Sequence, residues 1–422
     1  MLTRGRRPAV TALVLASALL MAACTGGKHP APKVPPTIAI GLLVPTSGAN
    51  AALGQQATLG AKLAVELVNQ DFEGLRLPLP LGPGAGLRNG TKLTLIVGNT
   101  ESAPEKVEKE ASRLVSEGAV GLVLADTIDV ASPAGRETDL IGVSLVDALS
   151  TSDTFAQLNR TAHFRIQPSD QQMVATALGL LFRERDTPTQ FKRIVTAAGT
   201  PTGALGQEVN LLRNSIEDLS LAAGYEVAGK DKVLPLSGPN AGQSDGKVVK
   251  GDAVLAVVTS PAEAAAANEL ATALKGTAPV IALGPAVGAF DALKNGNGSQ
   301  ALRAAGWSSE FAGRNPIAQV VSGMYEQAFQ AKLTDVAAAA FTATMVLALA
   351  MDQVTEFTPQ SVRGAVQQMS LPATQTIMPW NGVRFDGNGY NRLAAGIVEQ
   401  YMPNGYLVVH PAELATTPTV TL

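Results

Sequence analysis

The sequence predicts an α/β protein with two lobes, each built around a parallel sheet. Aliphatic strands alternate with amphipathic helices from residue 37 onwards, and the alternation occurs in two series of similar rhythm. Of the 422 residues, 46% are hydrophobic and 16% are charged, which is typical of a globular chain with a large core. The chain after residue 36 is long for one domain and suits two lobes.

The first series begins with an aliphatic run at 37–45, as expected of a strand covered on both faces. A helix follows it, with leucines at 59, 63 and 67 on one face. A second helix, after residue 103, has an apolar face containing Val107, Ala111, Leu114 and Val115. The other strands expected in this series are 92–99, 119–125 and 141–146.

The second series starts after residue 163 and repeats the same alternation. Its strands are expected at 193–198, 253–258 and 279–283. Three helices are expected in this series. One spans 170–184 and one begins after Pro261, and the helix between them has an inward face formed by Val209, Leu212, Ile216 and Leu219. Two more helices are expected near 316–331 and 335–353, and hairpins after residue 381, where Asp386-Gly387-Asn388-Gly389 has strong turn chemistry.

The uncharged run from Val336 to Met351 is apolar enough to raise the question of a membrane span. It is short for that role and is rich in alanine. We expect it to be a buried helix of one lobe.

The N-terminus has the layout of a secretory signal peptide. Arginines at positions 4, 6 and 7 precede a run without charge from Pro8 to Ala23. Cys24, the only cysteine of the chain, follows Leu20-Met21-Ala22-Ala23, and this sequence resembles the lipobox of bacterial lipoproteins. The resemblance implies that residues 1–23 are removed and that Cys24 is acylated and holds the protein on a membrane. The alternative is an ordinary signal peptide in which Cys24 lies near the cleavage site.

Residues 24–36 contain four prolines and two glycines and are expected to form a tether. Without residues 1–23, the chain has 29 basic and 35 acidic residues and no basic run. Nucleic acid is therefore not an expected partner.

Enzyme chemistry is not expected either. The three histidines, His29, His163 and His410, form neither a metal-binding pattern nor a triad pattern. The tetrapeptide at 244–247 matches SxxK, but it lies in a loop rich in glycine and proline without the partner motifs. We expect no catalytic residue, no metal and no cofactor.

The segment 38–69 resembles the opening of the leucine/isoleucine/valine-binding family of type I periplasmic solute-binding proteins. The residues that carry the resemblance are Pro45, Ser47, Gly48, Ala51, Gly54, Gly60, Ala61, Ala64 and Asn69. Further matches follow in order at 164–172, 203–227, 338–354 and 382–391.

This resemblance implies two lobes joined by three crossings, near residue 165, near residue 285 and within 378–395. The lobes would close on a small solute that an ABC permease then imports. The first lobe would comprise 37–165 and 286–377, and the second 166–285 and 378–410, followed by a C-terminal tail at 411–422.

Ligands of such sheets collect at the carboxyl ends of the strands. The resemblance therefore points to Ser47, Asp126, Thr127, Asp147, Ala148 and Ser150 in the first lobe. At positions where the family often has an aromatic residue, a tyrosine and an acid, this chain has Leu53, Thr202 and Ala286. Ser260 completes the set in the second lobe.

An ammonium group left without a counter-charge is costly to bury. We therefore expect a solute other than a zwitterionic amino acid, or an ammonium paired with Asp126 or Asp147. The alternative is that these two aspartates only cap the helices that follow them.

The function expected from the sequence is an exported, lipid-anchored solute-binding protein of a branched-chain-amino-acid-type ABC importer. The alternative is a surface lipoprotein of the same fold that senses a ligand or binds a partner protein.

Overall fold

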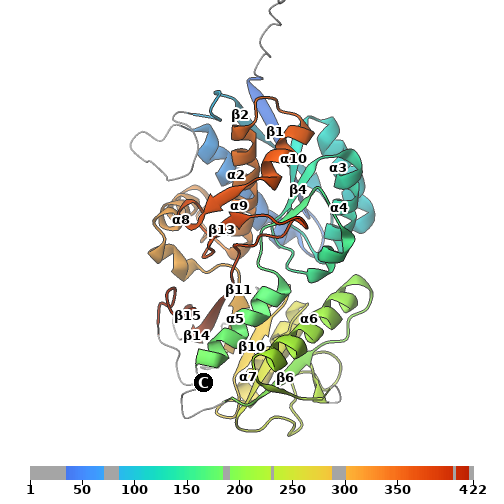
Figure 1. The fold of residues 1–422 in the computed structure, drawn as a ribbon, viewed down its shortest axis with the longest axis vertical. Helices are drawn as coiled ribbons and strands as arrows, with labels where there is room; N and C mark the ends of the chain where they lie inside the picture. Colours follow the sequence, from blue (N-terminus) through green and yellow to red (C-terminus); the bar gives the residue numbers. More distant parts are fainter. Residues whose placement is uncertain are drawn as a thin grey trace, which may run out of the picture. The chain divides into compact units, whose positions relative to one another are not determined.

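The computed structural model describes residues 35–70, 85–183, 191–229, 232–287, 301–402 and 405–417. The predicted signal peptide and Cys24 lie outside these residues. Residues Pro36–Leu422 form one compact unit, and its described residues include two large sheets with their covering helices (Figure 1).

The first sheet has five parallel strands in the order β2-β1-β3-β4-β5. They are β1 Thr37–Val44, β2 Lys92–Asn99, β3 Ala119–Leu124, β4 Ser144–Asp147 and β5 His163–Arg165. Strands β3 and β4 are buried along their whole length. Their aliphatic residues suit a sheet that helices cover on both faces.

Six helices pack on this sheet: α2 Ala51–Asn69, α3 Pro104–Ser116, α4 Ile128–Ile141, α8 Pro316–Phe329, α9 Asp335–Gln353 and α10 Pro359–Gln367. One core lies under α3 and α4, and a larger one lies under α2, α8, α9 and α10 on the opposite face (Figure 1).

Helix α9 lies at the centre of the larger core. It is long and apolar enough to cross a membrane, but 89% of its most apolar stretch is buried inside the protein. The prediction of a core helix is confirmed. Gly60 lets α2 approach α9 closely, because a Cβ at this position would lie 2.1 Å from the backbone oxygen of Ala337.

The second sheet is mixed, with the order β15-β14-β11-β10-β9-β6-β7 and β8 beside β6. Its strands are β6 Arg193–Ala198, β7 Glu226–Val227, β8 Leu234–Pro235, β9 Asp252–Val257, β10 Val280–Leu283, β11 Ala301–Ala305, β14 Ile397–Met402 and β15 Gly405–His410. The six strands β6 to β11 pair in parallel, and the predicted terminal hairpin, β14 and β15, adds two antiparallel strands.

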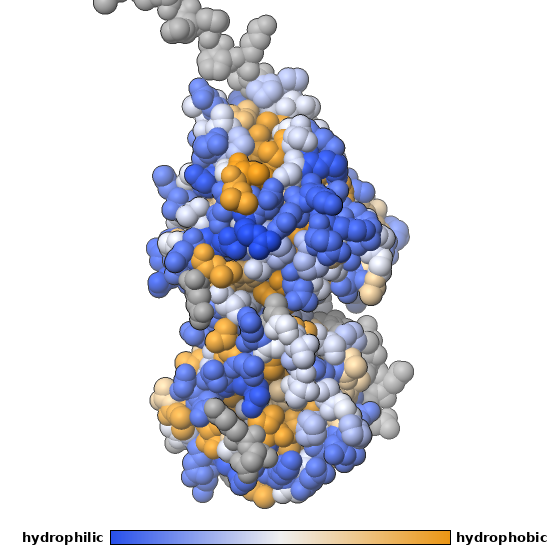
Figure 2. Space-filling view, turned by 90° about the vertical axis from the view of Figure 1, so that its right-hand side faces the viewer, coloured by the Kyte–Doolittle hydropathy of each residue, from blue (hydrophilic) through white to orange (hydrophobic). Residues whose placement is uncertain are grey.

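Helices α5 Asp170–Arg183 and α6 Gly203–Ala222 cover one face of this second sheet, and α7 Pro261–Ala273 covers the other. Short elements complete the chain: η2 Asp153–Leu158, η6 Ser309–Arg314, η7 Ala373–Gln375, and a two-stranded sheet of β12 Ser370–Pro372 and β13 Gly382–Arg384. Figure 2 shows one face of the molecule, mostly hydrophilic and broken by separate hydrophobic patches.

The chain leaves the first sheet after Arg165, near the expected crossing, and the second crossing lies later in the chain than the expected one. Strand β11 pairs with β10 and β14 in the second sheet, so residues 301–305 do not belong to the first lobe and the crossing follows Ala305 instead of residue 285. The five residues of β11 include a single large aliphatic one, so no aliphatic run marked the strand.

The third crossing falls at the end of the predicted range. Met378, Trp380, Val383, Phe385 and Ala394 are buried in the first lobe's core, so residues 378–394 belong there and not to the second lobe. The chain enters the second sheet only at Ile397. Within the predicted tail, Thr416 donates its backbone N–H to the oxygen of Val408 at 2.8 Å.

Candidate functional site

The predicted binding residues lie at the carboxyl ends of parallel strands. In the first lobe, Ser47 follows β1, Asp126 and Thr127 follow β3, and Asp147, Ala148 and Ser150 end or follow β4. In the second lobe, Thr202, Ser260 and Ala286 follow β6, β9 and β10. Each lobe thus gathers its predicted residues at one edge of its sheet, where open α/β sheets bind ligands.

Asp126 joins two loops of the first lobe. Its carboxylate accepts hydrogen bonds from the hydroxyl groups of Thr100 and Ser102 and from the backbone N–H of Thr127. Burial raises the pKa of Asp126, and these hydrogen bonds only partly oppose that effect. Through these hydrogen bonds, the carboxylate holds the loop after β2 against the loop after β3.

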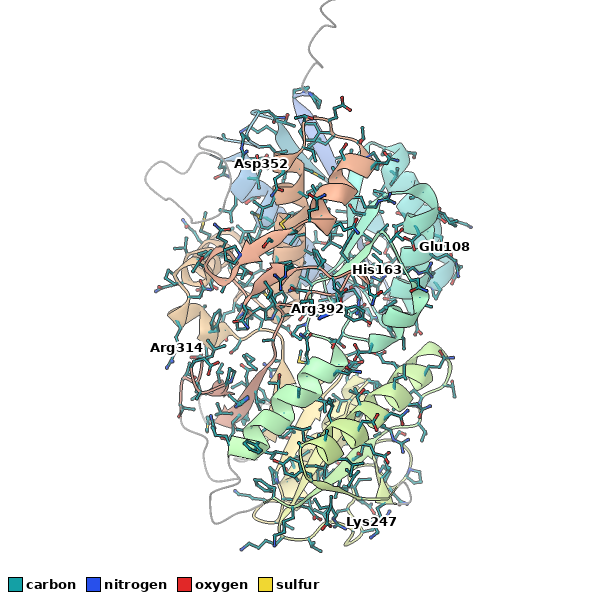
Figure 3. All side chains as sticks on the ribbon, in the orientation of Figure 1. Glu108, His163, Lys247, Arg314, Asp352 and Arg392 are labelled. Carbon is teal, nitrogen blue, oxygen red and sulfur yellow. The ribbon has the colours of Figure 1, made fainter. Side chains whose placement is uncertain are left out.

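Asp147 is fully buried and paired with His163. Its Oδ2 lies 3.1 Å from His163 Nε2, and its Oδ1 accepts the backbone N–H groups of Leu149 and Ser150. Burial acts to raise the pKa of Asp147, but His163 and Ser150 outweigh burial and hold the pKa below its usual value. His163, labelled in Figure 3, gave no functional signal in the sequence because it belongs to no metal or triad pattern.

The remaining first-lobe residues differ in exposure. Ser47 is exposed and its hydroxyl accepts a hydrogen bond from Asn99 at 2.9 Å. Leu53 and Thr127 are half-buried, and Ala148 is buried. Ser150 is only 7% exposed, and its backbone N–H donates to Asp147 Oδ1.

In the second lobe, Ser260 caps α7 by accepting the backbone N–H of Glu263. Thr202 is exposed beside the start of α6, and Ala286 is half-buried with its backbone N–H bonded to the oxygen of Val258. Among the predicted residues, the side chains of Ser47, Asp126, Asp147 and Ser260 therefore accept hydrogen bonds within the protein.

Sequence analysis did not single out Arg165, the last residue of β5, which is only 2% exposed. Its Nη1 donates to the backbone oxygen of Ser152, and its Cζ lies 3.4 Å from the ring centroid of Tyr390 and 5.1 Å from that of Phe155. In the part of the chain that the structure describes, its Nη2 has no hydrogen-bond partner. Burial lowers the pKa of Arg165 more than Tyr390 and the surrounding carboxylates raise it.

Glu208, on α6, was also missed. It is 2% exposed, and no described residue forms a hydrogen bond with its Oε2. Burial, followed by the charges of Asp170 and Asp129, raises the pKa of Glu208 to about 8, against the opposing effect of Arg165. A sequence signal existed, because Glu208 lies four and eight residues before Leu212 and Ile216 and so falls on the apolar face of α6.

Asp170 begins α5 and is bonded to the first lobe. Its backbone N–H donates to the oxygen of Thr151, and the N–H of Gln171 donates to Asp153 Oδ2 at 2.9 Å. Burial and the nearby Asp153 raise the pKa of Asp170 to about 6. We call Asp129, Asp153, Asp170 and Glu208, together with Arg165, the interlobe cluster. It combines residues of α4, η2, α5, α6 and β5.

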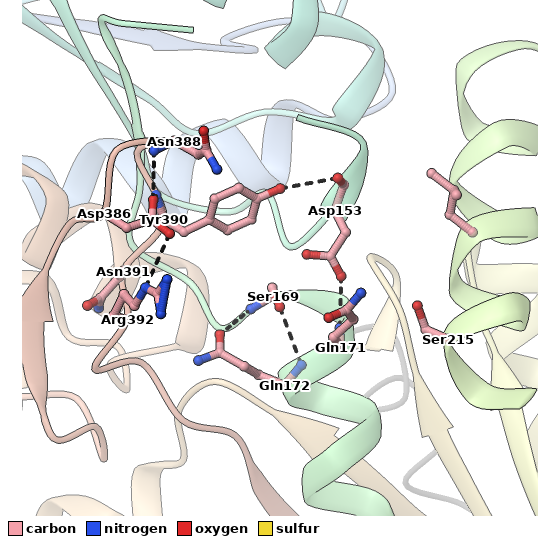
Figure 4. A pocket seen from close by; sticks show the side chains of 11 residues that line it. Asp153, Ser169, Gln171, Gln172, Ser215, Asp386, Asn388, Tyr390, Asn391 and Arg392 are labelled. Atoms are coloured by element: carbon pink, nitrogen blue, oxygen red, sulfur yellow. Dashed lines mark hydrogen bonds and ion pairs between the residues drawn. The ribbon is translucent and has the colours of Figure 1, made fainter. Parts of the chain in front are cut away.

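A cavity of about 540 Å³ opens beside this cluster (Figure 4), a size within the ~300–1,000 Å³ range of small-molecule sites. Its lining residues are Asp153, Ser169, Gln171, Gln172, Leu211, Ser215, Asp386, Asn388, Tyr390, Asn391 and Arg392. First-lobe groups from η2 and the 386–392 loop thus face second-lobe groups from α5 and α6. Asp153 links the cavity to the interlobe cluster, and Leu211 and Ser215 lie one and two turns along α6 from Glu208.

The loop at 386–392 is fixed by its own hydrogen bonds. Asp386 accepts the backbone N–H groups of Asn388 and Tyr390, and Arg392 pairs with its other carboxylate oxygen at 3.3 Å. Tyr390 donates its hydroxyl to the backbone oxygen of Asp153 at 3.2 Å. The cavity wall is therefore largely pre-formed and polar.

Comparison with protein-family models identifies the class of protein. A model described as a periplasmic binding protein matches residues 37–395. The chain therefore belongs to the periplasmic binding protein family, a family of binding proteins rather than enzymes. A comparison with curated proteins gives no significant match.

Solved structures of this type share the fold along most of the chain. An ABC transporter substrate-binding protein from Desulfitobacterium hafniense, in complex with leucine, is 19% identical with a TM-score of 0.65, covering 88% of this chain and 99% of its own. A leucine-binding protein from Thermotoga maritima is 16% identical with a TM-score of 0.67, covering 88% and 97%. A solute-binding protein from R. palustris, in complex with benzoate, is 18% identical with a TM-score of 0.65, covering 92% and 100%. The predicted two-lobed α/β fold is confirmed.

Proposed function

We propose that this protein is an exported solute-binding protein of an ABC importer, which captures a small solute by closing its two lobes. Family membership supports this proposal, as do the solute-bound structures that share the fold. The neighbours' ligands include an amino acid and an aromatic acid, so the fold accommodates several chemistries.

The observation that carries the proposal is a set of unsatisfied polar atoms where the two lobes meet. Arg165 Nη2 of the first lobe and Glu208 Oε2 of the second are buried and have no hydrogen-bond partner among the described residues. Each such group costs about 1–3 kcal/mol when it stays unpaired. A solute that supplied their partners would recover that cost only with the lobes closed.

We propose the residues that follow the strand ends as the remaining solute contacts: Ser47, Leu53, Thr127, Ala148 and Ser150 from the first lobe, with Thr202, Ser260 and Ala286 from the second. Asp126 and Asp147 hold these loops in place, which favours the interpretation of them as structural residues.

The test is a thermal-shift screen of the purified protein against amino acids, amides, short acids and polyamines. A solute at 100 times its dissociation constant stabilises the folded state by about 2.7 kcal/mol. A well-folded protein that no small solute stabilises would contradict solute capture.

We further propose that Cys24 carries acyl chains and anchors the protein on the outer face of a bacterial membrane, where a permease would be its partner. The lipobox-like sequence before Cys24 supports this.

The competing proposal is a surface protein that docks another protein. Such docking would need an apolar patch on the surface. Among the described residues, the exposed large apolar side chains are Leu140, Leu158, Phe182, Leu221 and Val249, which are spread over separate elements. This distribution favours a small solute.

A further inference from the structure

We propose that the solute carries a positively charged nitrogen, an ammonium or a guanidinium, that binds Glu208 between the lobes. This inference rests on the proposed function and specifies its substrate class. It differs from the sequence prediction, which assigned an ammonium to Asp126 or Asp147.

The first argument is that Glu208 lacks a partner where other buried carboxylates have one. Asp147 is bonded to His163 and two backbone N–H groups, and Asp126 to two hydroxyl groups and a backbone N–H. Glu208 is similarly buried, yet its Oε2 accepts no hydrogen bond from any described residue. A buried carboxylate needs charged or hydrogen-bonding partners, and a cationic N–H donor would meet both needs.

The second argument is the charge balance of the interlobe cluster. Besides burial, the charges of Asp170 from α5, Asp129 from α4 and Asp153 from η2 raise the pKa of Glu208, and the charge of Arg165 from β5 lowers it. The guanidinium of Arg165 also lowers the pKa of Asp153 and of Asp170, and its Cζ lies close to the rings of Tyr390 and Phe155. Three carboxyl groups besides Glu208 therefore outnumber one guanidinium, and this excess of negative charge favours a cation over an anion such as benzoate.

The third argument is access. The cavity of about 540 Å³ is lined by Asp153 of the cluster and by Leu211 and Ser215 of α6. Positions 208, 211 and 215 recur on one side of a helix. Glu208 does not line the cavity and is buried on this side of α6, so the proposal places the charged end of a small amine against it from the cavity.

The fourth argument concerns the protonation state. The raised pKa of Glu208, about 8, means that the carboxyl is mostly protonated at neutral pH without solute. A bound cation favours the carboxylate, so binding expels a proton to solvent and strengthens as the pH rises. A neutral or anionic solute that accepted a hydrogen bond from protonated Glu208 would show the opposite pH dependence.

The experiment uses the exported chain carrying Cys24→Ser and four probes: agmatine, putrescine, L-leucine and benzoate. Titration calorimetry at pH 6.5 and 8.5 measures affinity. Repeating it in two buffers of different ionisation enthalpy measures how many protons are released when a probe binds the protein with Glu208 unchanged. Glu208→Gln removes the charge with little change in shape. Glu217→Gln, on the same helix but outside the cluster, is the matched control.

We expect agmatine or putrescine to bind at least tenfold more tightly at pH 8.5 than at 6.5, with proton release. Glu208→Gln should weaken this binding at least tenfold and abolish its pH dependence, whereas Glu217→Gln should change neither. Amine binding that Glu208→Gln leaves intact, or that releases no proton, overturns the assignment. Binding of leucine or benzoate without amine binding overturns the cationic solute but leaves solute capture standing. If neither these probes nor the wider solute screen shows binding, both proposals fail.

Discussion

Replacing Glu208 with glutamine should make the protein more resistant to unfolding at alkaline pH. The pKa of Glu208 is raised from 4.5 to about 8 by burial and by the nearby carboxylates. The folded state therefore holds this proton more tightly than the unfolded chain does. The stability that depends on it is fully present below pH 4.5 and is lost as the pH rises through about 8.

The size of the effect follows from the two pKa values. Between pH 6.5 and 8.5 the free energy of unfolding of the wild type should fall by about 2 kcal/mol through this group alone. Glutamine does not titrate, so Glu208→Gln should not show this loss. The pKa of Asp170, about 6, lies below this range, so most of its contribution is already lost at pH 6.5.

The assay is urea unfolding followed by circular dichroism at both pH values, with wild type, Glu208→Gln and Glu217→Gln. The difference in unfolding free energy between wild type and Glu208→Gln should grow by about 2 kcal/mol towards pH 8.5. Glu217→Gln should follow the wild type. Equal losses in all three proteins would refute the assignment of a buried, protonated carboxyl to Glu208.

Three further predictions concern the fold and the anchor. Gly60→Ala should destabilise the protein by about 1–3 kcal/mol in chemical unfolding, because the new methyl group meets the backbone of α9. The control, Gly323→Ala on α8, adds its methyl group to open space and should be neutral or stabilise by up to about 1 kcal/mol. Equal effects of the two substitutions would contradict the close contact between α2 and α9. Asp147→Asn should lower the free energy of unfolding by about 1–3 kcal/mol at pH 7. This difference from the wild type should narrow below pH 4, because His163 holds the pKa of Asp147 low in the folded state. A difference that does not depend on pH would count against the pairing of Asp147 with His163. Cys24→Ser should move the protein from the membrane fraction to the soluble fraction without changing its melting temperature; retention in the membrane fraction would contradict the lipid anchor.

Much of the fold could be predicted because a strand buried in a parallel sheet can be recognised in the sequence as a run of aliphatic residues. The predicted strands at 92–99 and 193–198 coincide with β2 and β6. Helix α4 was not predicted, since Pro133 lies inside it and a proline normally argues against a helix. Strand β11 was missed because its only large aliphatic residue is Leu302. Its place depends on pairing with β10 and β14, which local sequence does not encode.

The site was less predictable. The strand ends indicated that Asp126 and Asp147 lie at one sheet edge, but the side chains that bond to them come from residues 16 to 26 positions away. Glu208 and Arg165 become notable only through burial between elements distant in sequence. A charged residue on the apolar face of α6 was the one local sign of Glu208.

The central claim is that the two lobes close on a solute, and inter-lobe distances test it most directly. Because Cys24 is the only cysteine, a chain with Cys24→Ser can carry spin labels at two chosen sites. Lys109→Cys on exposed α3 and Lys275→Cys beyond α7 place one label on each lobe. Pulsed electron resonance should show a shorter, narrower distance distribution with a saturating solute that raises the melting temperature. An unchanged distribution with that solute bound would contradict closure.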